Sequence, residues 1–411
     1  MVRASESYGV HSRPPGAPKL TVQAGKCLSK RWRLPRFAYH LASARDFFGR
    51  QPVLMVVEPE SLCWLTGRMV EARDGATWAE EFARFPALRA VVRDDGSGLG
   101  KGVKLERARR LAVGLADLDD SLDVFHTLRE GGRALRKDWG AATRALERAD
   151  AAQKDFDRRG RQGQSCQGHG APLNRLWQQA ERLWDQATAA ESAWKEAKSA
   201  FEFFTPDGRL NDRSQAEAVV AAALRYLGSE AWGKTRRLLL RRESFTFLDQ
   251  VQDRLAGLGL DAEVLSALLD LEGLRRQPWR ESAATGIWAL VRTVQLTKSC
   301  LKWRDEASRV CAVLRGVWRA SSLVECVNSV ARMQQARHRK MTQGLLDLKR
   351  LYWNLRQFRT GPRKGQMPYE QLGLKLPELT FPPKVPNDSL GWIGILQKIR
   401  CNSPFPLTLG S

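Results

Sequence analysis

The feature that most constrains the fold is a change in the hydrophobic pattern near residue 130. Before this point, short apolar runs such as Pro52 to Val57 and Ala87 to Val92 end at turn residues, which predicts buried strands. From about Glu130 to Leu314, Trp and Leu side chains instead recur at helical spacing between charged residues. We therefore expect a small α/β layer and a large all-helical block, in a chain that is helix-rich overall.

The chain is long enough for more than one core, because single cores stop growing at roughly 250–300 residues. A basic stretch with a helical pattern follows the helical block, and a segment rich in proline follows that stretch. We interpret the block as an insertion into the α/β core and the basic helix as the return to it. The predicted segments are a basic, poorly ordered N-terminal segment (1–45), the first part of the core (46–129), the all-helical insertion (130–314), the closing helix of the core (315–360) and a Pro-rich C-terminal tail (361–411).

The composition favours a polyanionic partner. The formal net charge is +22, so nucleic acid is the expected partner and a membrane surface is the weaker alternative. No run of about 18 uncharged apolar residues occurs, so we expect no membrane-spanning helix. The seven scattered cysteines form no CxxC pair, which favours reduced thiols in the cytoplasm over a disulfide framework. Cys166 and His169 have the spacing of two zinc ligands, but a second pair is missing.

One carboxylate stands at the start of the basic helix. From Arg315 to Gly365 there are twelve Lys and Arg residues against Glu325 and Asp347, so this segment carries 12 − 2 = +10 of the net charge. Glu325 has two explanations. With Ser322 it fits the S-x-x-E capping box, in which the Glu bonds back to the amide of the cap residue. Alternatively, it is a metal ligand that lies beside a polyanion.

Two further carboxylates follow predicted strands. Asp94 precedes a Gly-Ser-Gly turn, at the place where open α/β sheets hold ligands. Asp123 begins the sequence Asp-Val-Phe-His, which we interpret as another strand end. Oxygen ligands of this kind suit Mg²⁺, and two such ions about 3.5–4 Å apart can promote phosphodiester transfer. The alternatives are an ordinary turn at Asp94 and a strand-edge salt bridge between Asp123 and His126.

In order and context, these residues resemble transposases of bacterial insertion sequences, which carry a DDE catalytic triad on an RNase H-like fold. The resemblance covers most of residues 46–373. It rests on three blocks of sequence: Phe47 to Glu58; Val91 to Leu99 with Asp123 to His126 downstream; and Ser321 to Ser329, continuing through Asn354, Phe358, Gly361 and Pro368 to Gly373.

The resemblance implies an RNase H-like core split by the helical insertion, with Asp94 and Glu325 as catalytic metal ligands and Asp123 with His126 as a structural landmark. It implies Mg²⁺ or Mn²⁺ as cofactor, cleavage and strand transfer of DNA, transposon ends and target DNA as partners, an oligomer in the DNA complex, and a place at the bacterial nucleoid. The basic residues and the Asn expected to contact DNA are Asn328, Arg332, Arg337, Arg339, Lys340, Arg363 and Lys364.

The chain departs from the family pattern where the first aspartate is expected, just before Phe47. Asp46 is the nearest carboxylate, and we assign it as a substitute catalytic and metal-binding residue. Codons for Asp-Glu-Ile read one base out of phase can give Arg-Asp, as found at Arg45 and Asp46, so we hypothesise that residues 1–45 are an out-of-frame remnant. The chain is then either a transposase, truncated or inactive in the extreme case, or a non-catalytic basic DNA-binding protein derived from one. A helical RNA-binding or scaffold protein would explain the charge but not the order of the acidic blocks.

Overall fold

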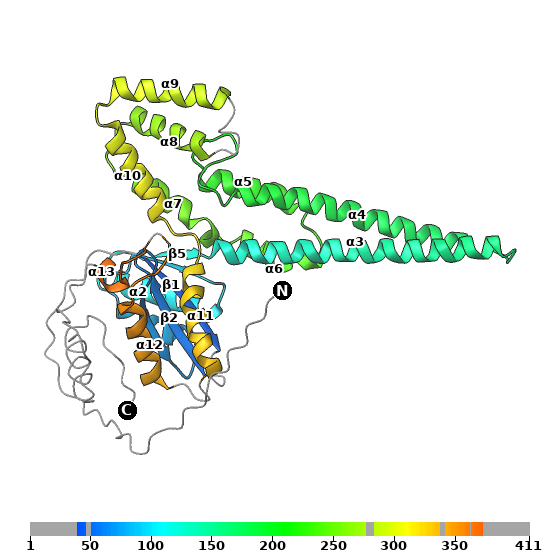
Figure 1. Cartoon of the computed structure of the whole chain (residues 1–411), viewed down its shortest axis with the longest axis horizontal. Helices are drawn as coiled ribbons and strands as arrows, with labels where there is room; N and C mark the ends of the chain where they lie inside the picture. Colours follow the sequence, from blue (N-terminus) through cyan, green and yellow to red (C-terminus); the bar gives the residue numbers. More distant parts are fainter. Residues whose placement is uncertain (1–38, 47–50, 277–282, 338–341, 362, 373–411) are drawn as a thin grey trace, which may run out of the picture. The chain divides into compact units, whose positions relative to one another are not determined.

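The computed structural model describes residues 39–46, 51–276, 283–337, 342–361 and 363–372. A five-stranded mixed sheet has the order β3-β2-β1-β4-β5 (Figure 1). β1 pairs antiparallel with β2, β2 pairs antiparallel with β3, and β4 and β5 continue parallel to β1. The strands are β1 (Tyr39–Asp46), β2 (Pro52–Glu58), β3 (Cys63–Met69), β4 (Ala90–Arg93) and β5 (Asp119–Leu122).

β1 is the central strand, although most of it lies in the segment predicted to be poorly ordered. The prediction for 1–45 is therefore corrected for residues 39–45, while the rest of that segment lies outside the described residues. The sequence of β1 has no alternating pattern, so its own propensity did not identify it. Pairing with β2 on one side and β4 on the other fixes it as a strand, because strand formation depends strongly on neighbours.

Four main helices cover the sheet. Helices α1 (Gly75–Ala83) and α2 (Ser97–Ala112) connect β3 to β4 and β4 to β5. Helix α11 (Ser322–Arg337) packs Val324 and Val327 into a cluster with apolar side chains of β2, including Val53. The single closing helix predicted over 315–360 is wrong: α11 ends before residues 338–341, which are not described, and α12 (Gln343–Leu355) follows as a second helix. A short helix, α13 (Pro368–Gln371), comes last.

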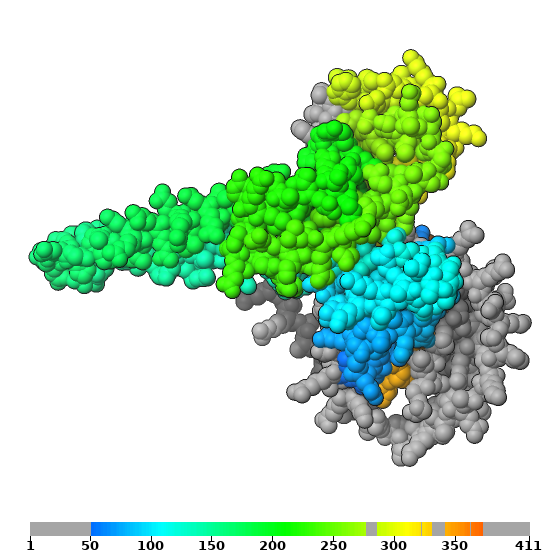
Figure 2. Space-filling view, turned by 180° about the vertical axis from the view of Figure 1, so that it is seen from behind, coloured from blue at the N-terminus to red at the C-terminus, as the bar shows by residue number. Residues whose placement is uncertain are grey.

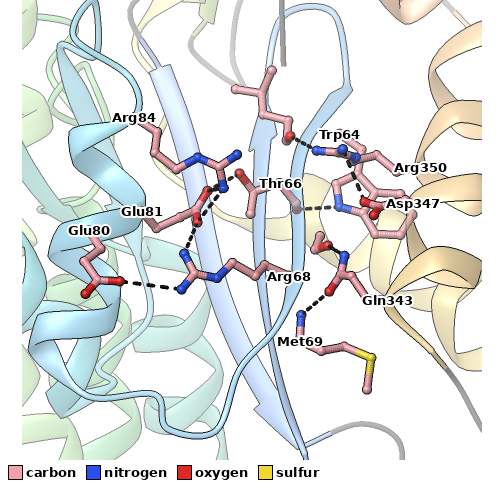
Figure 3. Close-up of polar contacts among 12 residues, drawn as sticks. Trp64, Thr66, Arg68, Met69, Glu80, Glu81, Arg84, Gln343, Asp347 and Arg350 are labelled. Carbon is pink, nitrogen blue, oxygen red and sulfur yellow. Dashed lines mark hydrogen bonds and ion pairs between the residues drawn. The ribbon is translucent and has the colours of Figure 1, made fainter. Parts of the chain in front are cut away.

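Helix α12 covers the free edge of β3 with two side-chain amides. The Gln343 side chain accepts from Met69 N and donates to Gly67 O, both over 2.8 Å (Figure 3). At the other end of the helix, Asn354 accepts from Trp64 N over 2.8 Å and donates to Trp64 O over 2.9 Å. The two amides therefore take the place of a neighbouring strand, which blunts an edge that would otherwise pair with another chain.

The helical region begins at Val124, six residues before the predicted boundary at 130. The predicted strand end from Leu122 to His126 is wrong, because β5 ends at Leu122 and a long helix follows at once. The helices of this region are α3 (Val124–Arg161), α4 (Gly170–Ser199), α5 (Arg213–Leu224), α6 (Gly233–Leu239), α7 (Thr246–Ala256), α8 (Ala262–Arg276), α9 (Ala283–Ser299) and α10 (Trp303–Gly316), with short 3-10 turns at η1 (Glu230–Trp232) and η2 (Arg242–Ser244).

Helices α3 and α4 form an antiparallel hairpin and lie side by side along their length (Figures 1 and 2). At its base, Trp194 packs against Trp232 with ring centroids 5.5 Å apart. The Trp232 indole N–H donates to Asp138 over 2.6 Å, which satisfies the polar group that this ring buries. Trp194 and Trp232 thus pack in the interior of the helical region, but the prediction that the tryptophans at helical spacing are core residues is wrong for Trp177 and Trp184, which are 37% and 45% exposed. Across the described residues, no helix is both long enough and apolar enough to cross a membrane.

Candidate functional site

Asp94 directly follows β4, and its carboxylate lies in the turn that leads into α2. Its Oδ1 accepts from Gly96 N over 3.0 Å, and the residue is partly exposed. A Cβ at residue 96 would lie 2.9 Å from that same oxygen, so Gly96 lets the turn close tightly on the carboxylate. The position after a strand, predicted from the sequence, is therefore the one observed.

A buried ion pair fixes the backbone beside Asp94. The Arg93 guanidinium donates from Nε to Asp120 Oδ1 over 2.6 Å and from Nη2 to Oδ2 over 2.8 Å. Both side chains are buried, at 2% and 5% exposure. Arg93 Nη1 also donates to the backbone oxygen of Asp94 over 3.3 Å. Sequence reasoning missed this pair, whose one signal was an Arg ending an apolar strand with an Asp in the next strand.

Asp123 caps α3 and joins it to the start of α11. Its Oδ2 accepts from His126 Nδ1 over 2.7 Å and from Ser321 N over 3.0 Å, and Ser321 Oγ donates to it as well. Burial raises the pKa of this carboxyl, but hydrogen bonds from His126 and Ser321 outweigh burial, and the pKa is lowered. The predicted Asp123–His126 pair is thus present, at a helix start and not at a strand edge.

Glu325 is the fourth residue of α11. The helix begins at Ser322, so its N-cap residue is Ser321. A capping box needs the Glu three residues after the N-cap, and Glu325 is four residues after Ser321, so the capping box proposed from Ser322 is not formed. Two hydrogen bonds connect this helix start to the end of β4: Asp123 N donates to Arg93 O over 2.7 Å, and the Asp123 carboxylate accepts from Ser321 N over 3.0 Å. The first turn of α11 therefore begins at the carboxyl edge of β4, where Asp94 lies.

The register of β1 bears on Asp46. Ala42 pairs with Arg93, so Ser43 is the β1 residue level with Asp94. Asp46 lies three residues further along the strand, which is roughly 10 Å at about 3.3 Å per residue. Its side chain lies outside the described part of the structure. The backbone register thus does not bring Asp46 level with Asp94.

Two pockets meet at Asp94 and Gly96. One, of about 530 Å³, is also lined by Arg129, Arg133 and Lys234. The other, of about 490 Å³, is also lined by Arg73 and Lys101. The carboxylate thus lies between two hollows whose walls carry both cationic and acidic side chains, with Asp95, Asp123 and Glu130 in the first and Asp74 in the second. The cationic side chains are the groups that phosphates of an extended polyanion would contact there.

Glu130 partly neutralises the cationic side chains of the pocket of about 530 Å³. Its carboxylate lies 2.7 Å from Arg133 Nη1 and 3.3 Å from Lys234 Nζ. Burial raises the pKa of Glu130, and the two cations more than offset burial, so the pKa is lowered. A phosphate entering this pocket would compete with Glu130 for both cations.

Of the seven residues predicted to contact DNA, the structure describes the side chains of Asn328, Arg363 and Lys364, and these three differ in exposure. Asn328 is only 1% exposed, so it cannot meet a phosphate in this state, and neither end of its amide has a hydrogen-bond partner. Arg363 donates to the backbone oxygens of Glu60 and Pro59 over 2.8 and 2.9 Å, which gives it a structural role at the β2–β3 turn. Lys364 is exposed. Arg332 and Arg337 lie on α11 with side chains outside the described residues, and Arg339 and Lys340 lie outside them altogether.

The donor chemistry of Asp94 and Glu325 fits a hard divalent cation, because Mg²⁺ prefers oxygen ligands and is commonly bound by one or two carboxylates with waters. Among the described side chains, no group of three His, Cys, Asp or Glu residues could hold a metal ion. Cys166 and His169 are among these described side chains, and they belong to no such group. A centre at Asp94 would therefore use these two carboxylates with waters, substrate oxygens or a residue outside the described set.

Comparison of the chain with protein-family models, with curated proteins and with solved structures finds no match.

Proposed function

We propose that the chain is a DDE-type DNA transposase, or a derivative of one, that cleaves and transfers DNA strands with Mg²⁺ or Mn²⁺. The observation that carries this proposal is the position of Asp94 after β4, beside the start of the helix that carries Glu325. The sheet order supports it: three antiparallel strands continued by two parallel strands is the arrangement expected of an RNase H-like core. The helical region between β5 and α11 occupies the place of the insertion that the resemblance implies.

In this proposal, Asp94 and Glu325 would hold the cation, which would supply Lewis-acid chemistry to the scissile phosphate and to the attacking water or DNA 3′-hydroxyl. The chain's own contribution is to position these two carboxylates. Arg93 and Asp120 fix the backbone of Asp94, while Asp123 fixes the start of α11 through Ser321. The two pockets at Asp94 hold the DNA strand on either side of the cut through Arg129 and Lys101.

The test is a cleavage and strand-transfer assay with Mg²⁺ or Mn²⁺, on a plasmid that carries the DNA flanking the gene. We expect metal-dependent nicking that falls by at least about 100-fold in Asp94→Asn and in Glu325→Gln, with DNA binding retained. Asp95→Asn is the matched control, because Asp95 is the adjacent carboxylate and pairs with Arg241 over 2.6 Å. Nicking that survives both substitutions would contradict the proposal.

The second candidate is a non-catalytic basic DNA-binding protein derived from such an enzyme. The register of Asp46, roughly 10 Å beyond the level of Asp94, favours this candidate over an intact three-carboxylate centre. It predicts salt-dependent binding to DNA without nicking by either metal. The same assay therefore separates the two candidates.

A further inference from the structure

Helix α9 has a stripe of apolar side chains that is exposed to solvent. Ile287, Leu290, Val291 and Val294 recur at the i, i+3, i+4, i+7 spacing of one helix face, and they are 60%, 65%, 39% and 47% exposed. Trp288 flanks the stripe and is 60% exposed. The yellow side chains of α9 are open to solvent in Figure 2. An apolar stripe at this spacing normally packs against a neighbouring element.

The side of α9 that packs against the helical core is the smaller one. Leu296 is fully buried and Ala289 contacts the same core cluster. Thr293, between them, donates its hydroxyl to Ala289 O over 2.8 Å and so needs no partner from outside the helix. The orientation is therefore fixed by one leucine and small residues, and it leaves the larger apolar surface uncovered.

The charges of α9 limit what can cover the stripe. Arg292 and Lys298 are the charged residues of Ala283–Ser299. Arg292 pairs with Asp270 of α8 over 2.7 Å, and Lys298 lies at the last turn. The stripe thus offers little to a nucleic acid, which needs several cations. An acidic partner finds little there either, so the occupant must itself be apolar.

We propose that a second copy of this chain covers the stripe, with α9 packed against α9 of the other copy about a two-fold axis. A two-fold interface brings the same patch of both copies together, so an uncharged apolar patch is complementary to itself. Two copies repel each other overall, because each carries a formal charge of +22. The stripe itself holds no charged residue, so it is a face on which two copies can meet without bringing like charges into direct contact.

The size of the stripe sets the strength of the contact. Five exposed apolar side chains cover roughly 500 Å² per copy, a size at which surface patches are often functional. Two copies would bury roughly 1,000 Å², near the lower limit for a specific interface. We therefore expect a reversible dimer that dissociates in the micromolar range. This proposal does not depend on the DNA chemistry proposed above.

The test is sedimentation velocity of the full chain without DNA, from about 1 to about 100 µM, a range that brackets a micromolar dissociation constant. We expect a concentration-dependent dimer in the wild type and a monomer in Leu290→Glu. The matched control is Leu240→Glu, because Leu240 is a similarly exposed leucine, at 70%, outside α9; this variant should still dimerise. Unfolding curves of all three proteins establish that each is folded.

A second measurement identifies the contact as one between like surfaces. Leu290→Glu and Leu290→Lys should each be monomeric alone, and an equal mixture should form a dimer because the opposite charges meet across the axis. A wild type that stays monomeric up to about 100 µM would overturn the proposal. So would a dimer that persists in Leu290→Glu, or a mixture of the two charged variants that does not associate.

Discussion

Ser321 donates its backbone N–H to Oδ2 of Asp123 over 3.0 Å, and its hydroxyl donates to the same oxygen. The two residues are 198 positions apart in the chain. Because Asp123 also caps α3, a single buried carboxylate connects the end of β5, the start of the helical region and the start of α11. The position of Glu325, one turn into α11, therefore depends on Asp123.

Removing this connection should destabilise the protein more than removing an ordinary cap. We expect Asp123→Ala to lower the free energy of unfolding by about 3 kcal/mol, because buried donors of Ser321 and His126 lose their acceptor. Asp212→Ala is the control, since Asp212 caps α5 with an exposed bond to Gln215 N; this change should cost about 1 kcal/mol. Urea unfolding measures both. Equal losses would show that the link to Ser321 contributes little.

The contribution of Asp123 should depend on pH in one direction. Its pKa in the folded protein lies below the ordinary value of 3.8, because hydrogen bonds from His126 and Ser321 overcome the effect of burial. The ionised carboxylate therefore stabilises the fold above this ordinary value, and that stability is lost as the pH falls through the lowered pKa. Below about pH 5, where an ordinary histidine is already protonated, the difference in unfolding free energy between wild type and Asp123→Asn should shrink as the pH falls through the lowered pKa of Asp123. A difference that grows as the pH falls from about 5 to about 3 would contradict this assignment.

Neighbouring glycines of α3 should respond oppositely to alanine. A Cβ on Gly131 would lie 2.1 Å from Cζ2 of the buried Trp194, whereas a Cβ on Gly132 meets only the end of Arg136 at 4.0 Å. Gly131→Ala should therefore destabilise the protein, by about 1–3 kcal/mol. Gly132→Ala should stabilise it by about 0.5–1 kcal/mol, because alanine is the better helix former. Thermal unfolding of both variants tests the packing of α3 against α4. That packing requires the melting temperature to fall in Gly131→Ala and to rise in Gly132→Ala.

The two side-chain amides of α12 that cover β3 should contribute to the free energy of unfolding in proportion to how deeply each is buried. Asn354 is fully buried and serves both backbone groups of Trp64, while Gln343 is partly exposed. We expect Asn354→Ala to cost about 2–3 kcal/mol, since it leaves a buried N–H and C=O unpaired, and Gln343→Ala to cost about 1 kcal/mol or less. Light scattering during refolding should also rise in Asn354→Ala, because the edge of β3 is uncovered. If Gln343→Ala lowers the free energy of unfolding more than Asn354→Ala does, the conclusion that Asn354 is the more important amide is wrong.

The register of β1 predicts how carboxylates there affect metal affinity. Asp46→Asn should leave Mn²⁺ binding almost unchanged, because its backbone lies roughly 10 Å beyond the level of Asp94. Ser43→Asp, which places a carboxylate level with Asp94, should strengthen Mn²⁺ binding measured by calorimetry, by about tenfold or more. Asp94→Asn in the same background should remove the gain. If Asp46→Asn alone abolishes binding, the register argument is wrong and Asp46 reaches the metal.

The sequence predicted the elements whose pattern reflects their own burial. The apolar run from Pro52 to Val57 forms β2, and the helical spacing of the tryptophans correctly indicated helices, although Trp194 is buried in the core while Trp177 and Trp184 are exposed. It did not predict β1, whose polar sequence becomes a strand through pairing on both sides. The break between α11 and α12 was also missed, because the basic pattern runs through both helices and the one glycine there, Gly344, lies inside α12 and not in the break.

The candidate site was predictable in its individual carboxylates and not in what holds them. Asp94 and Glu325 stand out as acidic residues in basic surroundings, which composition alone detects. Two side-chain pairs hold these carboxylates in place: Arg93 with Asp120, and Asp123 with Ser321. Each pair depends on which strands and helices become neighbours, and local spacing in the sequence carries no such information. For the same reason Asn328, which was expected to contact DNA, is buried. The out-of-frame origin of residues 1–45 stays a hypothesis that resequencing of the locus tests.

The amides that cover β3 have a consequence for synthesis on the ribosome. Gln343 follows Met69 by 274 residues. At about 5–20 residues per second, the edge of β3 emerges roughly 14 to 55 s before the helix that covers it. The helical insertion makes mostly local contacts and can fold during that interval. Newly made chains therefore pass through a stage with an open strand edge, and a chaperone or a fast-folding insertion must keep neighbouring chains apart until α12 arrives.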